Sequence, residues 1–153
     1  MHALLINPYI YDFAAYNFWS SPIGLLYIGS VLKINGFDVT LIDCLDVVDE
    51  KRKSDGRAPF LKKRADKPEA IKDIKKHFKR YGISHDEFIK RLCSVEKPDI
   101  VLITTIMTYW YVSTKEVLDI TREIFPSSKI LLGGIYPSLC YEHANASMIN
   151  SDL

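Results

Sequence analysis

The chain is poor in the features that mark secreted, membrane-spanning or metal-stabilised proteins. Its three cysteines, Cys44, Cys93 and Cys140, are odd in number and far apart, so they form neither a disulfide framework nor a Cys-x-x-Cys metal site. No segment approaches the ~18–20 apolar residues of a membrane-spanning helix. The start runs straight into the apolar stretch 3–7 and does not resemble a secretory leader. We therefore expect a cytoplasmic protein with no membrane contact.

Several well-known functional motifs are missing as well. A dinucleotide-binding strand would be followed by Gly-x-Gly-x-x-Gly, but here Pro8 and aromatic residues follow the first apolar run. There is neither a P-loop lysine motif nor the Ser/Thr/Gly phosphate loop of a flavodoxin. The histidines are scattered, at positions 2, 77, 85 and 143, so their spacing indicates no metal site. We accordingly assign no catalytic residue and no metal ligand.

Charge is present but unevenly distributed. The net charge is +1, yet residues 44–97 hold 16 lysines and arginines against 10 aspartates and glutamates. The remaining residues hold four against nine, so a basic segment interrupts a slightly acidic body. Such a segment is most often a solvated surface. Because its lysines are interspersed with acids and it lacks a recognition motif, we do not expect it to bind nucleic acid.

Apolar periodicity and capping residues predict alternating strands and helices. We expect strands at 3–7, 38–43, 99–104 and 129–132. A first helix begins near Ser21-Pro22 and stops at Asn35-Gly36; its apolar residues surround most of its circumference, so it should be nearly buried. Further helices are expected at 68–81, from the capping box 84–87 to residue 92, from Ser113 to residue 125, and for a turn or two within 138–148.

This rhythm is typical of an α/β protein. We expect a Rossmann-like or flavodoxin-like three-layer sandwich with a parallel sheet of four to five strands. A helical basic insert, 44–97, follows the second strand, and its part 50–67 is dense in charge. Residues 151–153 should begin a fifth strand, so we expect the sequence to be a piece of a longer protein.

Two strand ends carry small residues that could let a ligand approach the backbone. The strand at 99–104 ends in Thr104-Thr105, and the strand at 129–132 is followed by Gly133-Gly134. Only one helix separates them, so both ends should lie side by side on the same rim of the sheet. The carboxyl ends of parallel strands are where open α/β sheets bind ligands. The sequence therefore predicts a binding crevice at this rim.

The Thr104-Thr105 and Gly133-Gly134 pattern resembles the Ser-x-Leu … Gly-Gly half of the cobalamin-binding fold. The segments 4–8, 21–28 and 35–43 look like the N-terminal B12-binding domain of radical SAM enzymes. The segments 98–101 and 130–137 continue this resemblance, which covers most of the chain outside 44–97. Their order and spacing are together more specific than any single piece.

The resemblance implies a domain that binds cobalamin base-off, with the nucleotide tail inserted between the sheet and a helix. A threonine hydroxyl could hydrogen-bond the tail, and the glycines would leave room for its flat base. A radical SAM core, with a 4Fe-4S iron–sulfur cluster and S-adenosylmethionine, would lie beyond residue 153 and would most commonly be a methyltransferase. This chain would bind and orient the cofactor without being catalytic itself. The residues expected to contact cobalamin are Asn7, Pro8, Ser21, Pro22, Gly24, Asp43, Thr104, Thr105, Tyr109, Gly133, Gly134 and Tyr136.

The chain also departs from the related methyltransferases, whose Asp-x-His-x-x-Gly motif supplies a histidine ligand to cobalt. Here Leu45 takes the histidine position, two residues after Asp43, so this motif supplies no lower ligand to cobalt.

The aromatic loops 9–19 and 108–111 should line the rim as a pocket wall or a domain interface. We expect Gly134→Val to block the tail while leaving the fold largely intact. A cofactor-free interaction domain is the alternative, and a small flavin or nucleotide binder is a third hypothesis weakened by the missing phosphate loop.

Overall fold

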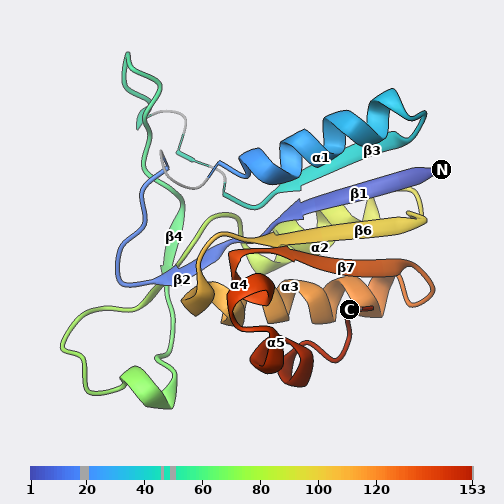
Figure 1. Cartoon of the computed structure of the whole chain (residues 1–153). Helices are drawn as coiled ribbons and strands as arrows, with labels where there is room; N and C mark the ends of the chain where they lie inside the picture. The colour runs from blue at the N-terminus through green and yellow to red at the C-terminus, as the bar shows by residue number, and fades with distance from the viewer. Residues whose placement is uncertain (18–20, 46, 49–50, 153) are drawn as a thin grey trace.

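A four-stranded parallel sheet forms the centre of the protein, described here from a computed structural model. Residues 1–17, 21–45, 47–48 and 51–152 are described. The sheet contains β1 (His2–Asn7), β3 (Asp38–Asp43), β6 (Ile100–Thr105) and β7 (Lys129–Gly134), in the order β3-β1-β6-β7. Figure 1 shows the four arrows side by side, with α1 next to β3 and the helices α4 and α5 next to β7 in this view. An α/β fold with a parallel sheet is therefore confirmed, and it is consistent with a Rossmann-like or flavodoxin-like arrangement.

The two faces of the sheet are covered to different extents. On one face, Leu4 and Ile103 belong to an apolar core shared with α2 (His85–Cys93) and α3 (Tyr111–Ile124). On the other face, Ala3 and Leu5 pack against α1 (Ile23–Ile34), which lies over β1 and β3. Since successive side chains of a strand point to opposite faces, β1, β3 and β6 contribute to both cores, whereas the apolar core residues of β7 belong to the first core.

Helix α1 is not nearly buried, contrary to the expectation from its composition. Only Leu25 and Gly29 are buried, whereas Tyr27 is 72% and Ile34 is 86% exposed. Gly29 lies on the buried face, where an added Cβ would meet the side chain of Leu5. The sheet covers one side of this helix, and among the described residues nothing covers the other side. An apolar helix face is therefore open to solvent.

The insert is not the helical segment that the sequence indicated. Residues 68–81 form a 3₁₀ turn at Glu69–Ile71 and the strand β5 (Lys79–Tyr81) instead of one helix. Strand β5 pairs antiparallel with β2 (Ile10–Asp12) on one side and β4 (Lys62–Arg64) on the other. This three-stranded sheet stands at the carboxyl rim of the main sheet (Figure 1). Among the described residues of the insert, the one α-helix is α2. It begins at the cap that the sequence predicts, where Ser84 Oγ accepts a hydrogen bond from the Glu87 amide at 3.1 Å.

The chain after β7 forms two short helices, α4 (Ile135–Leu139) and α5 (Tyr141–Ser147). The backbone of Asp152 then reaches the outer edge of β7, where its amide donates to the Ile130 carbonyl at 2.7 Å. Arg122 of α3 holds this segment through an ion pair with Asp152 at 2.7 Å. The expected fifth strand is not formed within the described residues. None of the described helices has the length and apolar character needed to span a membrane.

Candidate functional site

Four of the expected contact residues form one row across the carboxyl rim of the main sheet. Asn7 is in register with Asp43, and Thr104 is in register with Gly133. The pairing of Ile6 with Ile103 brings Asn7 next to Thr104, so the row runs Asp43, Asn7, Thr104, Gly133. All four residues share the face that carries α1, because they alternate with the residues of the opposite core. We refer to these four residues as the rim row.

One end of the rim row is rigid and polar. Asn7 is 2% exposed, and its Nδ2 donates a hydrogen bond to Asp43 Oδ1 at 2.9 Å. The same carboxylate oxygen accepts from the amide of Leu45 at 2.9 Å, which fixes the turn after β3. Thr104 is half-buried and Gly133 is exposed, so the row opens progressively toward β7.

The rim row crosses the topological switch point of the sheet, where the connections from neighbouring strands lead to opposite sides. Strand β1 leads through α1 to β3 on one side, and β6 lies on its other side. Such a switch point, between β1 and β6, is the usual ligand-binding position of open α/β sheets. Here it is closed, because the space bordered by Pro8, Thr105 and Trp110 measures about 10 Å³. That is room for about one water molecule at most.

Trp110 closes the switch point because it is held in two ways. It packs in a small apolar cluster with Ile10 of β2 and Leu45. Its indole Nε1 also donates to Asp12 Oδ2 at 2.9 Å. The aromatic segment 108–111 therefore forms part of the cover over the rim, while Tyr109 beside it remains 59% exposed. The loop 9–19 expected at the same rim is described only to residue 17, and within it Tyr9 is fully buried.

The paired glycines differ in their surroundings. Around Gly133, no atom lies within 4 Å of the position that a Cβ would occupy. Gly134 has a φ of +98°, and its Cβ position would lie 2.8 Å from the Thr105 amide nitrogen and closer still to the Thr105 carbonyl oxygen. Gly134 is thus required for the close approach of β6 and β7, and the expectation that Gly134→Val leaves the fold largely intact is wrong.

Three expected contacts are directed away from the rim row. Thr105 is buried, and its Oγ1 accepts a hydrogen bond from the Tyr136 amide at 3.2 Å. Tyr136 is 1% exposed; its ring stacks on Tyr111 and its hydroxyl lies 2.7 Å from His143 Nδ1. Together with Gly134, these residues build the junction between β7, α4 and α3. The structure therefore brings Asp43, Asn7, Thr104 and Gly133 together and separates them from Thr105, Gly134 and Tyr136.

The start of α1 supplies the remaining expected contacts. Ser21 is exposed, Pro22 is buried, and Gly24 is exposed with nothing within 4 Å of its Cβ position. The first turn of α1 therefore carries no charged side chain, and its exposed residues border solvent. Pro8 is buried beside the rim row and contributes to the closed space above it.

An apolar shelf extends from the rim row on the same face of β6 and β7. It consists of Leu102, which is half-buried, and Leu131, which is 39% exposed. Helix α1 covers β1 and β3 on this face and leaves β7 uncovered. Among the described residues, the shelf, with Thr104 and Gly133 at its upper end, is open to a ligand.

No histidine is available as a cobalt ligand at the rim. His2 lies at the start of β1, where its Nε2 is 2.9 Å from Thr40 Oγ1, and His77 contacts Arg64. His85 lies 3.7 Å from Glu116, and His143 contacts Tyr136. Among the described residues, no group of three or more histidines, cysteines and carboxylates could hold a metal ion.

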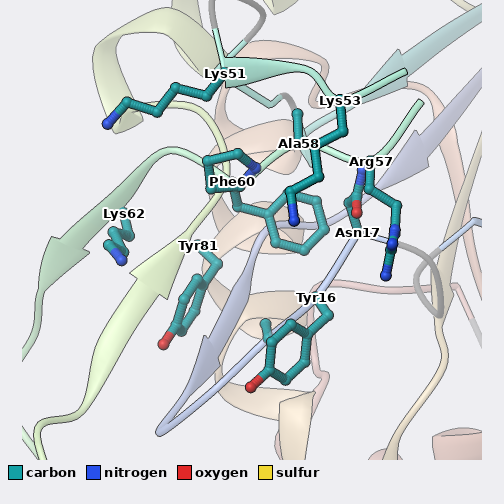
Figure 2. Close-up of a pocket in the computed structure, with 11 residues that line it drawn as sticks. Tyr16, Asn17, Lys51, Lys53, Arg57, Ala58, Phe60, Lys62 and Tyr81 are labelled. Atoms are coloured by element: carbon teal, nitrogen blue, oxygen red, sulfur yellow. The ribbon is translucent and has the colours of Figure 1, made fainter. Parts of the chain in front are cut away.

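The structure adds one feature that the sequence analysis missed, a cavity of about 710 Å³ at the three-stranded sheet. We call it the basic cavity. It is lined by Ala15, Tyr16, Asn17, Lys51, Lys53, Arg57, Ala58, Pro59, Phe60, Lys62 and Tyr81. Figure 2 shows aromatic rings gathered between lysine and arginine side chains from separate segments. The available signal was the cluster of positive charge within 44–97, but the sequence could not indicate which lysines converge.

Comparisons of the chain with protein-family models, with curated proteins and with solved structures found no match. The resemblance to B12-binding domains therefore rests on the segments and spacings of the sequence itself. Function has to be inferred from the rim row, the apolar shelf and the basic cavity.

Proposed function

We propose that the chain is a three-layer Rossmann-like domain that binds cobalamin base-off, as the accessory domain of a radical SAM enzyme. The observation that supports this most is the open end of the rim row. Thr104 and Gly133 lie in register at the carboxyl ends of neighbouring strands, above the uncovered Leu102 and Leu131. A polar group at the rim and an apolar surface below it suit a ligand tail that is polar along its length and flat and apolar at its end.

The nucleotide tail would lie on the shelf on the α1 face of β6 and β7. The free space at Gly133 lets a flat base approach the strand backbone, which a side chain would prevent. The Thr104 hydroxyl can both donate and accept a hydrogen bond at the point where the tail enters. Leu131 supplies apolar surface that is now in contact with water, so covering it with the base is favourable.

The corrin ring would lie over the β7 side of the rim rather than over Asn7. Trp110 and Leu45 fill the space above the switch point, so the ring is directed toward the exposed Tyr109. With no histidine nearby, the lower face of the cobalt would have no protein ligand, and binding would be His-off. Cobalamin supplies the methyl-carrying cobalt chemistry when bound. The residues of this chain bind the tail, hold the ring and exclude water from beneath it.

A visible-absorbance titration with hydroxocobalamin, followed by gel filtration, tests this proposal. The unmodified chain should retain the cofactor with a base-off spectrum. Gly133→Val should weaken binding at least tenfold, because the valine fills the open space on the shelf. Lys129→Val is the matched control, since it places the same side chain at the amino end of the same strand and face. Retention by Gly133→Val that equals retention by the control would refute the tail position.

A cofactor-free interaction domain is the second candidate, and the exposed face of α1 favours it. Ile23, Tyr27 and Ile34 are each more than half exposed, and the only charged residue in this helix is Lys33. An apolar surface of this kind marks a contact with another protein. If neither the unmodified chain nor Lys129→Val retains hydroxocobalamin while both remain folded by circular dichroism, this second function replaces the first.

A further inference from the structure

The basic cavity lies between segments that are far apart in the sequence. Residues 15–17 approach it from the end of β2, residues 51–60 cover it, and Lys62 and Tyr81 enter it from β4 and β5. Its volume of about 710 Å³ falls within the ~300–1,000 Å³ of small-molecule sites. The cavity stands beside the rim and contains none of the residues of the rim row.

The floor of the cavity is aromatic and held in place. Tyr81 is 6% and Phe60 is 4% exposed, and both belong to the apolar cluster that also contains Trp110. The Tyr81 hydroxyl donates to the Phe13 carbonyl at 3.1 Å, which fixes the ring. Tyr16, by contrast, is 58% exposed and lines the same cavity. A flat ring that enters the cavity therefore meets rigid, buried aromatic rings at the floor and the exposed ring of Tyr16.

Among the described residues of the lining, four carry a positive charge and none carries a negative charge. Lys53 and Arg57 stand on one side of the rings, and Lys51 and Lys62 on the other (Figure 2). Arg57 pairs with Asp55 at 2.5 Å outside the lining. Among the residues that the structure describes, the three lysines form no ion pair. Such cations are available to an anionic ligand that enters the cavity.

We propose that the basic cavity binds a nucleoside di- or triphosphate. The base would stack against the exposed ring of Tyr16, above the floor formed by Phe60 and Tyr81. The phosphates would lie among Lys51, Lys53 and Lys62. Stacking on aromatic rings accepts any base, and lysine binds phosphate as a point charge. A nucleotide would contact both the aromatic rings and the cations of the lining. A simple anion would contact only the cations, and an uncharged ring only the aromatic side chains.

A single nucleotide fits the arrangement better than a nucleic acid strand. Proteins that bind single strands combine a charged groove with a series of stacking rings, one for each successive base. Here the rings and cations line one cavity. The neighbouring basic residues Lys63 and Arg64 continue along β4, and Arg80 lies over the buried ring of Tyr9. They do not extend the stacking surface.

Isothermal titration calorimetry with ATP, in the full chain and without added magnesium, tests the proposal. ATP should bind at least tenfold more tightly than adenosine and at least tenfold more tightly than tripolyphosphate, because each lacks one half of the contacts. Lys62→Glu should weaken ATP at least tenfold. Lys63→Glu is the matched control, because it makes the same charge change on the next residue of β4, whose side chain points to the opposite face. It should change the affinity less than twofold.

Three results would overturn the proposal. Equal losses in Lys62→Glu and Lys63→Glu would indicate a diffuse attraction to the basic surface. Tripolyphosphate binding as tightly as ATP would indicate an anion site without a base. An oligothymidylate that binds more tightly than ATP, with several nucleotides covered per chain, would indicate a nucleic acid surface. Because the rim row is not part of the cavity, Lys62→Glu should retain hydroxocobalamin, and this proposal can fail while the proposed function holds.

Discussion

Gly134 lies so close to Thr105 that it has no room for a side chain. The position of its Cβ lies 2.8 Å from the Thr105 amide nitrogen, and the Thr105 carbonyl oxygen is nearer still. Its φ of +98° adds a second restriction, since residues with a Cβ rarely adopt this conformation. Gly133, next to it, carries neither restriction. One glycine of the pair therefore serves the fold, and the other is free to serve a ligand.

Substitution of the two glycines should affect stability to very different extents. Gly134→Ala should lower the free energy of unfolding by about 2–4 kcal/mol, through both backbone strain and displacement of β6 from β7. Gly133→Ala should change it by less than about 1 kcal/mol. Urea unfolding followed by circular dichroism measures both. Equal losses in the two variants would show that the strand ends are not arranged as described.

Asp43 should stabilise the fold because its side-chain oxygen accepts two hydrogen bonds. The negative charge of the carboxylate should contribute less. Its Oδ1 accepts from Asn7 Nδ2 and from the Leu45 amide, each at 2.9 Å. Asp43→Ala removes the acceptor from a buried amide group and should cost about 1–3 kcal/mol. Asp43→Asn keeps an oxygen acceptor and should retain most of the stability. Denaturant midpoints would decide this, and an asparagine variant as unstable as the alanine one would speak against the two hydrogen bonds.

The protein should lose stability in alkali partly through Tyr11. Burial, followed by the hydrogen bond to Glu116 at 2.8 Å, raises the pKa of Tyr11 to about 12. A group whose pKa is raised by folding stabilises the folded state fully at pH values below its pKa in the unfolded chain. For Tyr11 this stabilisation is lost between about pH 10 and about pH 12. Tyr11→Phe should therefore show a shallower fall in unfolding free energy over this interval. Identical pH profiles for the two proteins would contradict the raised pKa.

Lysine on the open face of α1 should leave the fold intact. Tyr27 and Ile34 are 72% and 86% exposed, so Tyr27→Lys with Ile34→Lys should change the stability by less than about 1 kcal/mol. The double variant should also bind less of a hydrophobic dye and self-associate less in light scattering. Leu25→Lys, at a position only 4% exposed, should unfold the protein. If the double variant unfolds as readily as Leu25→Lys, the exposed face of α1 is instead buried against other residues of the protein.

The parallel strands were predictable because each is a short apolar run bounded by turn residues. The expected strands 38–43 and 129–132 correspond to β3 and to most of β7. The segment 68–81 was not predictable in the same way. Its apolar residues repeat at helical spacing, yet Ile74 is 42% exposed, while Phe78 and Tyr81 are buried. Pairing of Tyr81 with Ile10, far earlier in the chain, determines this segment, and local periodicity cannot reveal such a contact.

The candidate site was predictable in position but not in detail. Parallel strand ends place Thr104 and Gly133 on one rim without any knowledge of the structure. The alternation of faces then separates them from Thr105 and Gly134. Which residue of each pair faces α1 depends on how the helices pack on the sheet, and the sequence does not determine that packing. The exposure of α1 was missed for a related reason. Its composition shows how apolar the helix is, but not how much of it the sheet can cover.

The central position of β1 has a consequence for synthesis on the ribosome. β1 can pair with β3 as soon as residues 2–43 have emerged, but its other neighbour, β6, is complete only at residue 105. At ~5–20 residues per second, the interval is on the order of 3–12 s. During that time the apolar stretch 3–6 presents an unpaired strand edge, which is a template for association with other chains. Nascent chains stalled before residue 100 should therefore aggregate or be bound by chaperones more readily than chains that have passed residue 105.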